Sequence, residues 1–71
     1  MSVDPKEIFE LIIKAAEKLK YSTDANMEQR RRQAIDLLVQ ARDAAREAGV
    51  EQLVQQAETR LADLQASASG D

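Results

Sequence analysis

The chain has few residues that interrupt a helix, and this constrains its fold more than any other feature. Of 71 residues, one is proline and two are glycine. Pro5 follows Asp4 and precedes Glu7, the order of an acidic N-cap, a proline at the first helical position and a capping-box glutamate. Gly49 is suited to end a helix in the left-handed conformation. Because apolar residues recur at the helical period around these breaks, the sequence predicts an all-α fold.

The first helix is predicted over residues 5–21, with Val3 and Ile8 spaced to form a hydrophobic staple at its start. Its apolar stripe contains Ile8, Leu11, Ile12, Ala15, Ala16 and Leu19. Phe9 and Ile13 lie outside this stripe and widen the apolar arc to roughly 200°. A helix with so wide an arc either packs between two neighbours or leaves an apolar patch for a partner.

The second helix is predicted over residues 25–48, but several residues compete to cap it. Thr23 or Asp24 would start the helix early. Asn26 with Gln29 three residues later would form a capping box and start it later. The capping rules alone leave both starts open.

The second helix carries a heptad-like seam of mostly small residues. The seam consists of Met27, Arg31, Ala34, Leu38, Ala41, Ala45 and Ala48. Its alanines would let a neighbouring helix come close. Gly49 would then end the helix, with Val50 folding back on Ala45 in a Schellman motif. A third amphipathic helix is predicted over residues 51–66.

Short connections between the three helices predict an antiparallel, up-down-up three-helix bundle. We expect residues 1–66 to form a single domain, near the lower size limit for a fold without disulfides or metals. Residues 67–71, rich in serine and alanine, are predicted to be a flexible tail.

The composition excludes most of the chemistry that small domains carry out. The chain contains no cysteine and no histidine, which removes disulfide scaffolds, thiol nucleophiles, histidine acid–base sites and the common zinc sites. No metal or other cofactor is therefore expected. The net charge of −3 opposes non-specific binding to nucleic acid or anionic membranes. Since the longest run of large apolar residues, Leu11 to Ile13, is too short for a membrane span, we expect a soluble, cytoplasmic protein.

Arg30, Arg31 and Arg32 form the one concentrated group of charges in the sequence. Such a run can contact an anion or a nucleic acid. Three consecutive helical side chains nevertheless fan out over roughly 200°, and Glu28 is spaced to pair with Arg32. A solvated helix start is therefore favoured. The carboxylate pairs of the chain lie on polar faces without a pocket to desolvate them, so no enzymatic activity is expected.

Phe9, Ile13 and Val39 are the candidate interface residues, because they lie off the main apolar seams. They either flank the core or form a surface on which the first helix binds a partner helix or a second copy of the chain. In the first case no partner is required, and in the second a homodimer through the first helix is one outcome.

Two resemblances bear on what the chain is. Ala34, Leu38 and Ala41 match the small-large-small spacing of the second helix of a tetratricopeptide-type repeat, and residues 34–64 resemble that helix running into the next repeat. The capped start at residues 4–7, the glycine-terminated helix joint and the clean binary pattern resemble computationally designed helical proteins. The second resemblance implies a structural scaffold with no natural biochemical activity. The alternative is a small docking module.

Lysine and arginine are divided between the two parts of the chain. Every lysine lies between Lys6 and Lys20, and every arginine lies between Arg30 and Arg60. Solvated helix faces accept either residue, so the fold does not require this division. It indicates a chain assembled from two sources, with the join near residues 21–26.

Overall fold

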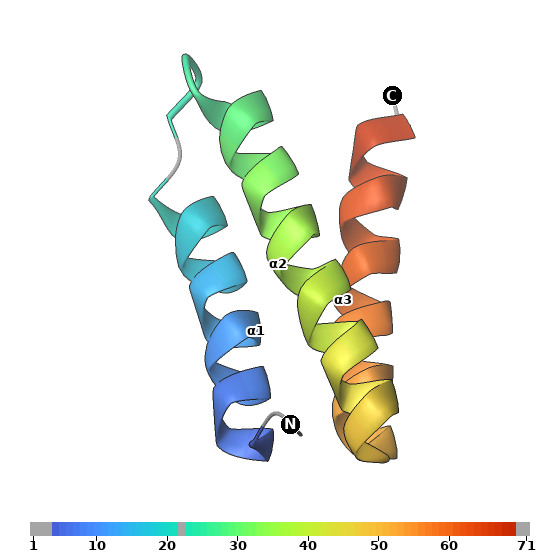
Figure 1. Ribbon diagram of the computed structural model, residues 1–71. Coiled ribbons are helices and arrows are strands. Elements are labelled where there is room, and N and C mark those ends of the chain that lie inside the picture. The colour runs from blue at the N-terminus through green and yellow to red at the C-terminus, as the bar shows by residue number, and fades with distance from the viewer. Residues whose placement is uncertain (1–3, 22, 70–71) are drawn as a thin grey trace.

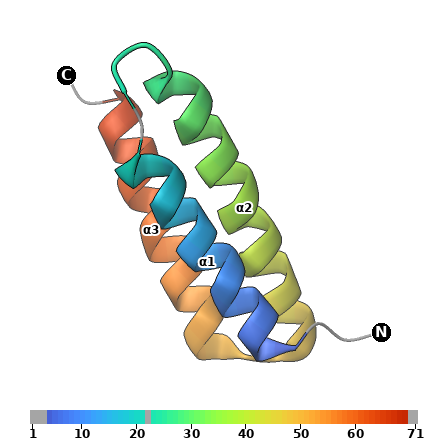
Figure 2. The same cartoon turned by 90° about the vertical axis from the view of Figure 1, so that its left-hand side faces the viewer.

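The computed structural model describes residues 4–21 and 23–69, and this part of the chain folds into three helices. They are α1 (Pro5–Lys20), α2 (Met27–Ala48) and α3 (Glu51–Ser69). Successive helices run in opposite directions, up, down and up (Figure 1). Seen from the side of α1, the other two helices lie behind it, one to each side (Figure 2). The predicted all-α three-helix bundle is confirmed.

The start of α1 is capped as predicted. The Asp4 carboxylate accepts a hydrogen bond from the Lys6 backbone N–H at 3.5 Å. The Asp4 carbonyl accepts from the N–H groups of Glu7 and Ile8. These bonds satisfy donors that a helix start otherwise leaves unpaired. The staple predicted between Val3 and Ile8 involves a residue outside the described part of the chain.

The connection between α1 and α2 differs from the predicted boundaries. α1 ends at Lys20, one residue early, with Tyr21 after it, and α2 begins at Met27 instead of residue 25. The Asn26 side chain does not cap α2. Its amide oxygen accepts a hydrogen bond from the Thr23 backbone N–H at 2.7 Å, and the Asn26 N–H binds the Thr23 carbonyl at 3.1 Å. Since this turn occupies the side chain, the capping box does not form.

The joint between α2 and α3 is a Schellman motif. Gly49 has a left-handed backbone with φ 74°. The Gly49 N–H binds the Arg46 carbonyl at 3.2 Å, and the Val50 N–H binds the Ala45 carbonyl at 2.9 Å. The predicted return of Val50 to Ala45 is confirmed, and the two hydrogen bonds turn the chain directly into α3.

α3 begins at Glu51 as predicted but continues to Ser69, so the predicted end at Ala66 is wrong. Residues 67–69 contain no proline or glycine, and the next helix breaker in the sequence is Gly70. The flexibility expected of residues 67–71 stays a prediction, and residues 70 and 71 lie outside the described chain.

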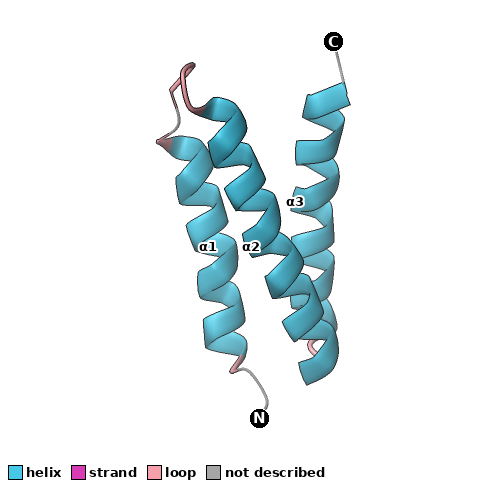
Figure 3. Cartoon of the chain, turned by 45° about the horizontal axis from the view of Figure 1, so that its top comes forward, coloured by secondary structure: helices cyan, strands magenta, loops and turns pink. Residues whose placement is uncertain are grey.

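The core lies along α2. Among the described residues, the buried ones are Ile8, Ile12, Ala15, Ala34, Leu38, Ala41, Ala45, Leu53, Ala57 and Leu61. Five of these ten are alanine, which permits close approach of the helix backbones. α1 and α3 each pack mainly against α2 and touch one another little. α3 lies closest to α2 at their connecting turn and diverges toward its C-terminal end (Figure 3).

Replacing Gly49 tests the joint between α2 and α3. Gly49→Ala should lower the free energy of unfolding by about 1 kcal/mol, because a Cβ is disfavoured in the left-handed conformation. The added Cβ itself would meet no atom within 4 Å, so the effect isolates the backbone conformation. Gly49→Asn should cost less, since asparagine tolerates this conformation. Urea unfolding followed by circular dichroism measures both; an alanine variant as stable as the unaltered chain would contradict the assignment.

Candidate functional site

The three candidate interface residues occupy two kinds of position. Val39 is half-buried and packs against the core, so it belongs to the core flank. Phe9 and Ile13 are 46% and 41% exposed. They lie one turn apart on α1, and the half-buried Ala16 lies about one turn further along the same side. Phe9, Ile13 and Ala16 are called the α1 edge below.

Helix geometry explains why the α1 edge is exposed. Ile8 and Ile12 face the core and are fully buried. Phe9 and Ile13 each follow one of these residues, so their side chains point about 100° away from the core direction. α1 packs mainly against α2 and makes little contact with α3. The wide apolar arc of α1 is therefore only partly covered by the described chain.

The α1 edge leads into a groove of about 200 Å³ between the three helices. Ala16 belongs to both the edge and the groove. The other lining residues are Ala15, Leu19, Leu38, Arg60, Asp63 and Leu64. The two charged residues both come from α3, whereas the lining from α1 and α2 is entirely apolar. An exposed apolar edge that continues into a groove with one apolar side and one partly charged side is the form of a helix-docking surface.

Three exposed charged residues border the α1 edge: Lys6, Glu10 and Glu17. Each lies within about one helical turn of Phe9 or Ile13. The ion pairs among the described residues lie elsewhere, between Glu28 and Arg31, Arg42 and Asp43, and Arg46 and Glu58. None of the three bordering charges is held by one of these ion pairs, although Glu17 also lines the cleft between α1 and α2 that is described below.

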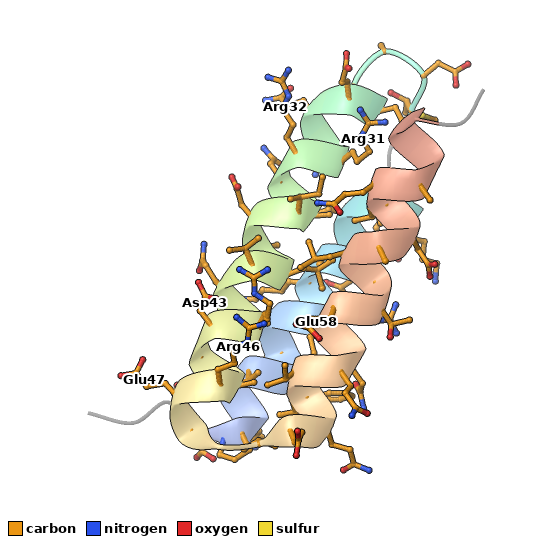
Figure 4. The ribbon with its side chains drawn as sticks, turned by 90° about the vertical axis from the view of Figure 1, so that its right-hand side faces the viewer. Arg31, Arg32, Asp43, Arg46, Glu47 and Glu58 are labelled. Carbon is orange, nitrogen blue, oxygen red and sulfur yellow. The ribbon has the colours of Figure 1, made fainter. Side chains whose placement is uncertain are left out.

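Arg46 on α2 and Glu58 on α3 form an ion pair between two helices (Figure 4). Arg46 Nη2 and Glu58 Oε2 lie 2.7 Å apart. Both side chains are about half exposed, so the pair stabilises the fold by less than about 1 kcal/mol. This pair could not be predicted from the sequence, because helical periodicity reveals charge partners within one helix and not across two.

The arginine run does not form one basic face. Glu28 pairs with Arg31 at 3.5 Å, so the pairing predicted with Arg32 is wrong. The i,i+3 position lies on the same helix face as the i,i+4 position and competes with it for the carboxylate. Arg31 lies on the side of α2 toward α3, whereas Arg32 points away from α3 (Figure 4). Arg30 lines a different surface, the cleft between α1 and α2.

That cleft, of about 450 Å³, gathers cations from two helices. It is lined by Lys14, Glu17, Lys18, Tyr21, Arg30 and Leu37. The sequence predicts a solvated helix start for Arg30, and it does not predict that Arg30 lies near Lys14 and Lys18. The i,i+4 spacing of Lys14 and Lys18 was the available signal. The described ion pairs and hydrogen bonds hold none of the three cation side chains in place, so the cleft supplies positive charge without an ordered set of donors.

Ile8→Ala and Phe9→Ala form a matched pair that tests which side of α1 is buried. Ile8→Ala should lower the free energy of unfolding by about 2–4 kcal/mol, because it leaves a cavity in the core. Phe9→Ala removes a larger side chain from a half-exposed position and should cost less than about 1 kcal/mol. Urea unfolding at low protein concentration gives both values. Equal losses would mean that Phe9 is part of the core and that the α1 edge is misassigned.

No family model matches the chain, and comparisons with curated proteins and with solved structures give no match. The likenesses to tetratricopeptide-type repeats and to designed proteins therefore rest on sequence patterns alone. Within the described chain, no helix is long and apolar enough to cross a membrane, and no cluster of acidic side chains is placed to hold a metal ion. The chain is a small three-helix, all-α bundle.

Proposed function

We propose that this chain is a non-catalytic structural module that docks a partner helix on the α1 edge. One observation carries the proposal: Phe9 and Ile13 are two large apolar side chains, adjacent on one helix and both more than 40% exposed. The other large apolar residues of α1 are buried or packed against the core. Adjacent exposed apolar residues that continue into a groove are typical of an interaction surface.

The partner that fits this surface is an amphipathic helix lying along α1. Its apolar residues, spaced three or four apart, would pack on Phe9 and Ile13 and then on the small Ala16. Arg60 and Asp63 of α3 line the adjoining groove, where they offer one donor and one acceptor to polar groups of the partner. Docking would thus complete the burial of the apolar arc of α1.

The non-catalytic part of the proposal is supported by how the interior is used. Every buried residue of the described chain is apolar, and the charged side chains lie exposed or half-exposed on the surface. Acid–base and nucleophilic catalysis depend on side chains whose surroundings alter their protonation or reactivity. The interior of this bundle is instead used for packing.

A photoreactive phenylalanine analogue at position 9 tests the docking role. We expect one cross-linked product of discrete mass, from the purified chain or from an extract of the cells that make it. The same group at position 55, where Gln55 is exposed on α3, should give none. Ile13→Glu should abolish the product while the helical circular dichroism is kept, because Ile13 is not part of the core. Equal yields from both positions, or no product from position 9, would contradict the proposal.

A second proposal is that the chain is an engineered scaffold with no natural biochemical activity. It is supported by the hydrogen-bonded cap at Asp4 and the complete Schellman motif at Gly49. Both are devices that designers install to fix helix ends. The division between lysine and arginine favours the same origin, with two sources joined near the α1–α2 connection.

Thermal unfolding distinguishes the two proposals. An engineered scaffold should unfold cooperatively without any ligand, with a Tm above about 90 °C. A natural docking module should melt at an ordinary temperature and gain stability when its partner is added, because the partner binds the folded state alone. A broad, non-cooperative melt of the pure chain would rule out the engineered scaffold.

A further inference from the structure

We propose that the helix docked on the α1 edge is α1 of a second copy, with the two helices antiparallel about a two-fold axis. This inference rests on the proposed docking role and names the partner. The observation that carries it is the order of charged residues along the α1 edge, with a lysine near the start and a glutamate near the end. Opposite charges on two copies of this edge meet only when the two helices run in opposite directions.

The apolar residues fix where the two-fold axis lies. Phe9 and Ile13 are equally far in sequence from Leu11. A two-fold axis that passes the α1 edge at the level of Leu11 along the helix, on the side of α1 opposite the Leu11 side chain, therefore brings Phe9 of one copy against Ile13 of the second copy, and the reverse. Each aromatic ring then packs on a β-branched side chain, and both exposed residues are covered. The two Phe9–Ile13 contacts form the apolar centre of the pair.

The charges then meet with opposite sign. Lys6 and Glu17 are eleven residues apart, close to three full turns, so they border the α1 edge on the same side. Lys6 lies five residues before Leu11 and Glu17 lies six after it, so reversal brings Lys6 within about 1.5 Å, along the helix axis, of Glu17 of the second copy. Both side chains are exposed, and neither has an ion pair among the described residues. The two-fold axis makes this contact twice.

A parallel arrangement would do the opposite, because Lys6 would face Lys6 and Glu17 would face Glu17. The charge order therefore selects the antiparallel pair by penalising the alternative. Glu10 lies close to the axis, where its two copies repel.

α1 has 16 residues, and a single pair of helices about 24 Å long buries less than the roughly 1,200 Å² of a stable interface. The pair is thus weak and depends on concentration.

Charge reversal tests the pairing and its direction. Sedimentation equilibrium, run up to millimolar concentration, should show a monomer–dimer equilibrium for the unaltered chain. Lys6→Glu or Glu17→Lys should each weaken dimerisation about tenfold, because two symmetry-related contacts change sign. An equimolar mixture of the two variants should regain the dimer, since positions 6 and 17 then carry opposite charges at both contacts between unlike copies.

Arg32→Glu and Asp36→Lys are matched controls. They change the net charge by the same amounts at exposed positions of α2, outside the α1 edge. Each should dimerise as the unaltered chain does, and their mixture should gain nothing. Ile13→Glu should give a monomer that retains its helical circular dichroism.

The outcomes separate this inference from the docking role. A chain that stays monomeric at millimolar concentration, yet cross-links from position 9 to a different protein, overturns self-pairing and leaves the docking role standing. A monomer that gives no cross-link overturns both. A dimer whose strength is unchanged by Lys6→Glu and Glu17→Lys, or not recovered in their mixture, overturns the antiparallel arrangement.

Discussion

The close packing made possible by the alanines of α2 determines the rest of the structure. Ala34, Ala41 and Ala45 are each fully buried, and the facing helices contribute Ala15 and Ala57. With only methyl groups at these contacts, helix axes can approach to about 8 Å, the short end of the usual range. The larger core residues then fill the space around the alanines. α2 thereby serves as the common support on which both shorter helices pack.

This support also determines what α1 leaves exposed. The buried alanines of α2 contact only a narrow face of α1. The fully buried residues on that face are Ile8, Ile12 and Ala15. The neighbouring Phe9 and Ile13 fall outside the contact because each helical residue turns the side chain by about 100°. α3 packs on another side of α2 and diverges from it, so it does not cover them. The candidate docking surface is therefore a consequence of the narrow contact between α1 and α2, which leaves Phe9 and Ile13 uncovered.

Local rules were sufficient for the fold, since caps, glycine and helical periodicity act over a few residues; Asp4 and Gly49 behave as those rules require. They failed at Asn26, whose side chain can accept a hydrogen bond from the backbone N–H of Thr23 or from that of Gln29. The sequence does not show which of the two bonds is preferred. The candidate site depends on contacts between helices. Phe9 and Ile13 could be singled out because they lie outside the main apolar stripe around α1. Their exposure, however, depends on where α3 lies, and helical periodicity does not reveal this. The cleft between α1 and α2 that gathers Lys14, Lys18 and Arg30, and the Arg46–Glu58 ion pair, were not predicted for the same reason.

The most direct test of this account compares two alanine-to-leucine changes by urea unfolding. Ala41 is fully buried on α2, whereas Ala62 is exposed on α3. If close approach to α2 holds the bundle together, Ala41→Leu should lower the free energy of unfolding by about 1–3 kcal/mol, because the added atoms force the helices apart. Ala62→Leu should change it by less than about 0.5 kcal/mol. An Ala41→Leu variant as stable as Ala62→Leu would contradict the central role of the alanine contacts.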